Sequence, residues 1–163
     1  MKMNKLLALI LALLLLSGCA AVGEEPLMTR PFVRYYRAAG GESLLADEVV
    51  DLGEQMPDYT AILNDYFAGP HLPGLLNPFP PDLRCEGVTV RDGVAEIRLS
   101  MAFTELAGIE LTTAAAAIAK TMEQFDEIRS VCLQTDEVML SELWNTPFSS
   151  SEFLFFDTAS QTE

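Results

Sequence analysis

The stretch Val88-Thr89-Val90-Arg91-Asp92-Gly93-Val94-Ala95-Glu96-Ile97-Arg98-Leu99 predicts the centre of the fold, a β-hairpin. Apolar and polar residues alternate on both sides of Asp92-Gly93, and this dipeptide between alternating runs is a strong signal for a tight hairpin turn. The alternation gives the return strand one apolar face, so Glu96 and Arg98 are expected to face solvent.

An amphipathic helix is predicted before the hairpin, with Pro57 in its first turn. Its apolar stripe has the spacing i, i+3, i+4, i+7, i+8 and consists of Tyr59, Ile62, Leu63, Tyr66 and Phe67. Gly69-Pro70 is expected to end the helix, because glycine suits a left-handed cap and proline cannot continue a helix. From Pro70 to Pro81 five prolines remove backbone donors, so an ordered loop without a helix or strand is expected there.

A second helix is predicted after the hairpin, from Thr112 or Thr113 to near Phe125, because either threonine can cap its start. The alanines of the run 114–117 would let this helix lie close to a sheet. Alternating stretches predict further strands at 32–37, 43–52 and 128–135. The resulting β-β-α-β-β-α-β order predicts an α+β fold with a mixed β-sheet and two helices on one face.

These elements, in this order and spacing, resemble the GerMN domain of sporulation and germination lipoproteins. The matching features are the helix that ends in Gly69-Pro70, the proline-rich loop, the hairpin with Asp92-Gly93 at its tip, and a return strand that closes in Leu99-Ser100 before Phe103. The likeness covers roughly residues 32–138. It implies a core similar to the ring-building motifs of secretion and sporulation channels, in a domain that acts by packing against other proteins.

Residues 1–18 have the pattern of a secretory signal peptide, with Lys2 and Lys5 before an apolar run that is too short to span a membrane. The run ends in Leu16-Ser17-Gly18-Cys19, which resembles the lipobox of bacterial lipoproteins. That resemblance implies that Cys19 is diacylated and anchors the mature chain to the outer face of the cell membrane; an ordinary signal peptide is the alternative. The remaining predicted segments are a tether at 19–31, the domain with an aromatic extension at 32–156, and a polar tail at 157–163.

The chain is acidic, with a formal net charge of −14 that becomes −16 once Lys2 and Lys5 leave with the signal peptide. Such a charge repels nucleic acid and anionic phospholipid alike, and no basic stripe is present to follow phosphates. We therefore expect no nucleic-acid partner. The lipid on Cys19, rather than surface charge, would hold the protein at the membrane.

Sequence signals for catalysis or for a bound cofactor are weak. His71 is the one histidine and lies in the proline-rich loop, and Ser100 lacks a nucleophile elbow. The ligand spacings typical of zinc or calcium sites and the glycine-rich phosphate loop do not occur in the sequence. We expect no enzyme activity, no metal and no cofactor, although a hydrolase that uses His71 or Ser100 remains an alternative.

Two cysteines remain after Cys19, namely Cys85 before the hairpin and Cys132 in the last strand. By strand parity both are expected on one face of the sheet, where an oxidising location would permit a disulfide. The other interpretation is that they are unpaired, buried, small apolar residues.

Apolar residues in the proline-rich loop and beyond residue 140 are candidates for an interface, because aromatic side chains often anchor contacts between proteins. The candidates are Leu75, Leu76, Phe79, Trp144, Phe148, Phe153 and Phe155. For the C-terminal aromatics the other reading is an edge strand or extension that completes the core. The leading hypothesis is an assembly module that binds envelope proteins or further copies of itself. The alternative is a lipoprotein whose loop and aromatic tail bind a cell-wall fragment or a small molecule.

Overall fold

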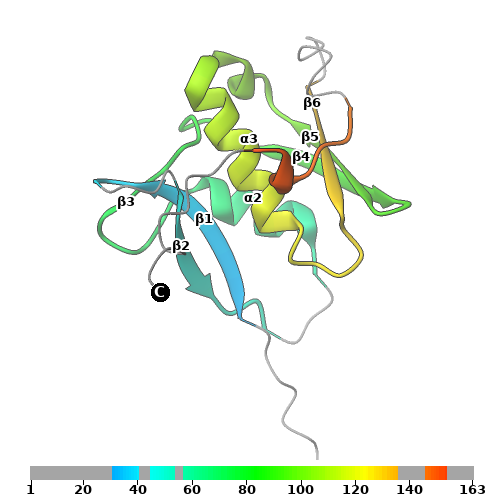
Figure 1. Ribbon diagram of the computed structural model, residues 1–163, viewed down its shortest axis with the longest axis horizontal. Coiled ribbons are helices and arrows are strands. Elements are labelled where there is room, and N and C mark those ends of the chain that lie inside the picture. The colour runs from blue at the N-terminus through cyan, green and yellow to red at the C-terminus, as the bar shows by residue number, and fades with distance from the viewer. Residues whose placement is uncertain (1–30, 41–44, 54–56, 136–145, 154–163) are drawn as a thin grey trace, which may run out of the picture.

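The computed structural model describes residues 31–40, 45–53, 57–135 and 146–153 of the chain (Figure 1). The predicted signal peptide, Cys19 and the tether up to Arg30 lie outside these residues, as do Trp144, Phe155 and the polar tail. The elements are β1 (Phe32–Ala38), β2 (Leu45–Val50), α2 (Tyr59–Phe67), β3 (Leu75–Leu76), β4 (Cys85–Arg91), β5 (Val94–Leu99), the 3-10 helix η1 (Met101–Glu105), α3 (Gly108–Met122), β6 (Ser130–Thr135) and the 3-10 helix η2 (Ser150–Glu152).

The described strands form two three-stranded sheets. In the first, with the order β2-β1-β3, β1 is antiparallel to both neighbours. In the second, with the order β4-β5-β6, β5 is antiparallel to β4 and parallel to β6. The α+β class is confirmed, and the second sheet is mixed, as expected. That β1, β2 and β3 form a separate sheet was not expected.

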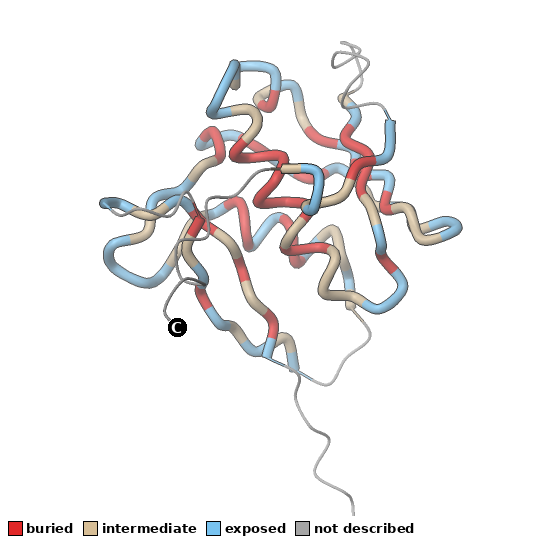
Figure 2. Tube along the Cα trace, viewed as in Figure 1, coloured by how far each residue is buried: buried red, intermediate tan, exposed pale blue. Residues whose placement is uncertain are grey.

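The two helices lie on one face of the second sheet, as expected, because residues of α2 and α3 share one core with Ala95, Ile97 and Leu99 of β5, whereas Glu96 and Arg98 on the opposite face are exposed. α3 contacts β1 of the first sheet and β6 of the second, whereas α2 packs on β4 (Figure 1). The alanines of the run 114–117 are all buried, which confirms the close approach that they predicted. Figure 2 shows the buried residues gathered along α3 and the elements that face it.

Amide side chains from the helices cover two exposed strand edges. Asn64 of α2 accepts a hydrogen bond from the backbone N–H of Cys85 and donates one to its carbonyl, both at 3.0 Å. Gln124, just after α3, pairs in the same way with Val33 of β1, at 2.9 Å and 2.6 Å. Because a strand edge with free donors and acceptors invites pairing, the side chain of Gln124 satisfies the backbone groups of Val33 where no strand pairs with them.

The hairpin has the predicted turn. Asp92 and Gly93 adopt φ angles of 52° and 85°, and two consecutive positive φ values are the signature of a type I′ turn. The strands on either side pair from Arg91 opposite Val94 to Cys85 opposite Leu99. Glu96 and Arg98 are exposed, as predicted.

The C-terminal end of α2 agrees with the prediction, whereas the starts of both helices differ: Pro57 lies before the N-cap residue Asp58 and not in the first turn of α2. Asp58 caps α2 by accepting a hydrogen bond from Ala61 N, and Gly69 follows the helix with φ 106°. α3 begins at Gly108, four residues before the predicted start. Thr112 Oγ1 donates to the carbonyl oxygen of Gly108 at 3.0 Å, so this threonine bonds back to the preceding turn of the helix and does not cap its start.

The proline-rich loop contains a short strand that was not predicted. β3 pairs with the end of β1, with Leu76 opposite Arg37. Leu75 and Leu76 lie in a stretch of four residues without proline, between Pro73 and Pro78, so both have backbone N–H groups that can donate. Two consecutive residues with donors are enough for a two-residue ladder.

Two aromatic residues proposed for an interface are instead part of the core. Phe79 is 5% exposed, and its ring lies 4.8 Å from the rings of Tyr66 and Phe67. Phe148 is also 5% exposed and exchanges two backbone hydrogen bonds of 2.9 Å with Val131 in β6. The interface reading is therefore wrong for both residues, and the reading of a core-completing extension is confirmed for Phe148 and for Phe153, which packs partly buried against the core.

Cys85 and Cys132 are buried and are not joined by a disulfide, so of the two interpretations that of buried, small apolar residues is the one that the structure supports. Cys85 lies opposite Leu99, whereas Cys132 lies opposite Glu96, which belongs to the other face of β5. They are two strands and three residues apart, roughly 14 Å from the usual strand spacings, and a disulfide needs Cα atoms within about 7 Å. The parity argument failed because a bulge between Cys85 and Gly87 moves Cys85 to the core face.

Candidate functional site

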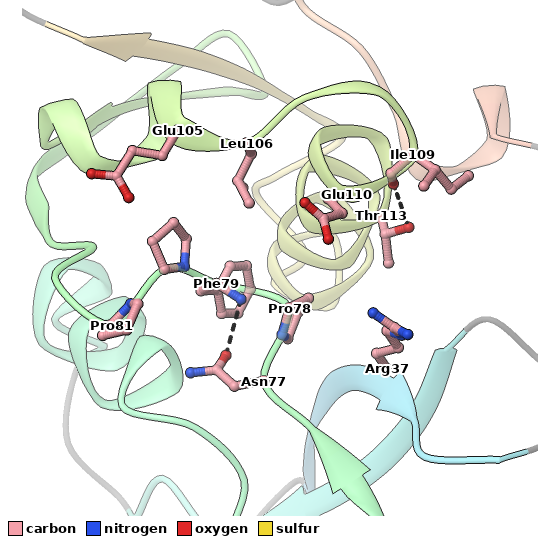
Figure 3. Close-up of a pocket in the computed structure, with 11 residues that line it drawn as sticks. Arg37, Asn77, Pro78, Phe79, Pro81, Glu105, Leu106, Ile109, Glu110 and Thr113 are labelled. Atoms are coloured by element: carbon pink, nitrogen blue, oxygen red, sulfur yellow. Dashed lines mark hydrogen bonds between the residues drawn. The ribbon is translucent and has the colours of Figure 1, made fainter.

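A surface groove lies between the proline-rich loop and the start of α3. It has a volume of about 570 Å³ and opens to solvent (Figure 3). We call it the proline groove, and its lining residues are Arg37, Asn77, Pro78, Phe79, Pro80, Pro81, Glu105, Leu106, Ile109, Glu110 and Thr113.

The walls of the proline groove are apolar and stiff. The prolines form one side, Leu106 and the first turn of α3 form the other, and Phe79 is buried beneath (Figure 3). Asn77 holds the loop in place, since its Nδ2 donates to Phe67 O at 2.9 Å and its Oδ1 accepts from Phe79 N at 3.2 Å. Because proline fixes φ, this wall is shaped before anything binds.

Ile109 is the most exposed large apolar residue among the described residues, at 66%. It projects from the first turn of α3, where Gly108 begins the helix with φ 55°. Leu76, one residue before the groove wall, is 43% exposed. Among the predicted interface residues, Leu75 is half-buried and Leu76 is exposed beside this groove.

The acidic and the basic side chains of the groove come from different elements. Glu105 and Glu110 project from the α3 side, and Arg37 reaches in from the end of β1 (Figure 3). All three are exposed. None of the three has a side-chain hydrogen bond or ion pair within the part of the chain that the structure describes.

A buried polar cluster fixes the start of the proline-rich loop. Arg34 of β1 and Glu48 of β2 lie opposite each other, each 3% exposed. Arg34 pairs with Asp65 of α2, and Glu48 Oε1 accepts the backbone N–H groups of His71 at 2.7 Å and Leu72 at 2.9 Å. Since buried charges are tolerated when they are paired and hydrogen-bonded, these contacts join sheet, helix and loop.

The structure does not bring His71 and Ser100 together. The His71 imidazole is 73% exposed, with Nδ1 3.6 Å from Glu48 Oε2. Ser100 Oγ accepts from Arg84 N at 3.1 Å and donates to Asp82 O at 3.4 Å. Both residues therefore serve loop geometry in this structure.

Ionisable groups of the core have shifted pKa values. Burial, with opposing effects of Arg34 and Glu48, raises the pKa of Tyr36 to about 12. Burial and a hydrogen bond to Glu127 raise the pKa of Tyr59 to about 12. Burial also raises the pKa values of the Cys85 and Cys132 thiols, which lowers their reactivity.

The described part of the chain holds no group of three His, Cys, Asp or Glu side chains placed to bind a metal ion. Nor is any helix in that part both long enough and apolar enough to cross a bilayer.

The groove was missed at the sequence level because its residues come from three separate segments. A signal existed in Glu105-Leu106-Ala107-Gly108-Ile109-Glu110, where apolar and acidic residues surround the true start of α3. The buried pair of Arg34 and Glu48 was missed as well. Arg34 has the same strand parity as Phe32 and Tyr36, both of which are buried.

Comparison with protein families gives a match over most of this fold. The model of the Germane family, described as sporulation and spore germination, matches residues 34–140, which is more than half of the chain. The chain belongs to the Germane family. The resemblance to GerMN domains that the sequence suggested is thereby confirmed.

Solved structures show the same fold as this Germane domain. It is similar to the first GerMN domain of the sporulation protein GerM from Bacillus subtilis, with 20% identity and a TM-score of 0.59 over 75% of this chain and 96% of that one. It is also similar to the tandem GerMN domains of that protein, with 23% identity and a TM-score of 0.55 over 74% of this chain and 44% of that one. No curated protein matches the chain.

Proposed function

We propose that this Germane-family chain is a lipoprotein, anchored by Cys19 to the outer face of the cell membrane, whose domain binds a protein partner through the proline groove. The family membership supports a role in sporulation or germination. The lipobox-like Leu16-Ser17-Gly18-Cys19 supports the anchor, and the groove supports the contact with a partner.

The observation that carries the proposal is the exposure of Ile109 beside a stiff apolar wall. Ile109 is 66% exposed at the rim of the groove that the prolines line, and the backbone of these prolines is fixed before binding. A preorganised surface loses less entropy when a partner docks, and an exposed apolar residue at such a surface gains burial on docking. The partner is an envelope protein or a second copy of this chain.

The anchor would strengthen such a contact. Two acyl chains give stable membrane attachment, and confinement near the bilayer raises the effective concentration of a partner in the same membrane. A groove of modest size can therefore serve an assembly that would be weak in free solution.

The proposed role is not catalytic. The hydroxyl of Ser100 is bonded to the loop backbone, and the described contacts of His71 are with Glu48. These contacts support structural roles for the two residues suggested for a hydrolase.

A second candidate function is the binding of a cell-wall fragment or small molecule. The groove volume of about 570 Å³ favours it, because ligand sites commonly measure roughly 300–1,000 Å³. The loop at Asn77–Pro81 lines the groove as that hypothesis expected. The described aromatic residues of the tail, Phe148 and Phe153, do not line it.

Co-purification from membranes tests the proposal. Tagged full-length chain would be compared with Ile109→Lys, with Cys19→Ser, and with Val49→Lys as a matched control, since Val49 is 58% exposed on β2. We expect wild type and Val49→Lys to retain the same protein partner, Ile109→Lys to lose it at least tenfold, and Cys19→Ser to leave the membrane fraction. Equal recovery with Ile109→Lys would contradict docking at the groove. Membrane retention of Cys19→Ser would contradict the lipid anchor.

A further inference from the structure

We infer that the proline groove binds a basic polypeptide segment, with a Lys or Arg side chain placed between Glu105 and Glu110. This inference rests on the proposed function, because it specifies the chemistry of the partner that docks there.

The two carboxylates are free to act on a partner. Some acids of the domain are used within the fold, since Asp65 pairs with Arg34 and Glu86 contacts Arg98 at 3.6 Å. Glu105 and Glu110 have no such side-chain partner among the described residues, although both border the same concave surface.

The surface between the carboxylates suits the stem of a basic side chain. Leu106 lies between Glu105 and Glu110 along the groove wall, opposite the prolines (Figure 3). Lys and Arg bury their methylene stems on apolar surface while the charged head stays at a polar rim. Apolar walls also reduce solvent screening, which strengthens attraction between opposite charges.

Arg37 makes one end of the groove basic, so the two ends of the groove differ in charge. Its guanidinium enters from the end of β1, apart from Glu105 (Figure 3). A second basic residue on the partner would be repelled at this end, whereas a carbonyl or carboxylate oxygen would be accepted. The segment that fits therefore carries one basic residue toward Glu105 and apolar or acidic residues toward Arg37.

The charge of the whole chain points the same way. A formal net charge of −14 attracts cationic partners at long range and repels anionic ones. Wall polymers and phospholipids with anionic groups are for this reason poor occupants, and a basic protein segment is a good one.

Photo-crosslinking in intact cells tests the inference. A benzophenone amino acid would replace Leu76, which is exposed beside the groove and leaves Ile109 in place, in the full-length chain, and the crosslinked peptide would be sequenced. The comparison pairs Glu105→Gln/Glu110→Gln with Asp47→Asn/Glu96→Gln, which removes two exposed carboxylates outside the groove. Two exposed ion pairs together change an affinity by roughly two- to thirtyfold.

We expect the crosslinked peptide to carry Lys or Arg within four residues of the attachment point. The crosslinking yield should fall at least about twofold in Glu105→Gln/Glu110→Gln and stay unchanged in the control. An equal yield in both double variants, or an attached segment without a basic residue, would overturn the inference while leaving docking at the groove intact. Absence of any protein adduct at position 76 would overturn the proposed function as well.

Discussion

Replacing Phe79 with alanine tests whether this residue of the proline-rich loop belongs to the hydrophobic core and not to an exposed interface. Phe79 is 5% exposed, and its ring lies 4.8 Å from the rings of Tyr66 and Phe67. Truncation of a buried Phe to Ala typically costs about 3–5 kcal/mol. Pro78 and Pro80 limit how far the loop can collapse into the cavity, so we expect a loss of at least about 3 kcal/mol.

The assay is urea unfolding of the mature chain with Cys19→Ser, followed by far-UV circular dichroism. With an m-value of about 1.5 kcal/mol/M, the midpoint should fall by roughly 2 M. Phe79→Leu, which keeps most of the volume, should cost less than about 1.5 kcal/mol and stays folded if the alanine variant does not. Leu76→Ala is the control, because Leu76 is 43% exposed and should change stability by no more than about 0.5 kcal/mol. A loss for Phe79→Ala as small as that of the control would refute the core assignment.

Three further predictions concern the same domain. The four tyrosines have pKa values raised mainly by burial, two of them to about 12 from the ordinary value of 10.0. Because the unfolded chain loses these protons at lower pH than the folded chain, the folded state loses stability as the pH rises from 10 toward 12. Absorbance at 295 nm should show that tyrosinate forms in the folded chain at a higher pH than in free tyrosine. Cys85 and Cys132 should resist alkylation in the native chain, react fully in denaturant, and show no mass change on reduction that would indicate a disulfide. Gly93→Ala should cost roughly 1–3 kcal/mol in urea unfolding, because φ is 85° there, whereas Gly40→Ala, with open space around the added methyl group, should be nearly neutral.

The elements that the sequence predicted well are those set by local chemistry. Asp92-Gly93 determines the hairpin turn whatever surrounds it, and Gly69-Pro70 ends α2 at the expected place. The Germane fold was recognisable because such local signals occur in a fixed order along the chain.

The features that sequence reasoning missed depend on contacts between distant segments. The bulge at Gly87 reverses the parity of Cys85, and no local pattern announces it. The hydrogen bonds of Gln124 to the backbone of Val33 join residues 91 positions apart, which no local pattern in the sequence indicates.

The candidate site was predictable in part. The proline-rich loop, which the sequence suggested for an interface, lines the groove with residues 77–81, and Leu76 is exposed. The opposite wall was not predicted, because α3 was expected to start at Thr112 or Thr113. The true start at Gly108 places Ile109 and Glu110 on the first turn of the helix, where they border the groove.

The central claim is that a protein partner docks in the proline groove, and hydrogen exchange tests it most directly. Amide exchange would be measured on the purified chain alone and in complex with its co-purified partner. The first N–H groups of a helix lack intrahelical acceptors and exchange readily, so the first turn of α3 at Gly108–Leu111 is a sensitive reporter. The account predicts slower exchange there in the complex and no change in β2 at Leu45–Val50. Slowed exchange confined to β2 or to the β4–β5 hairpin, with the first turn of α3 unaffected, would contradict it.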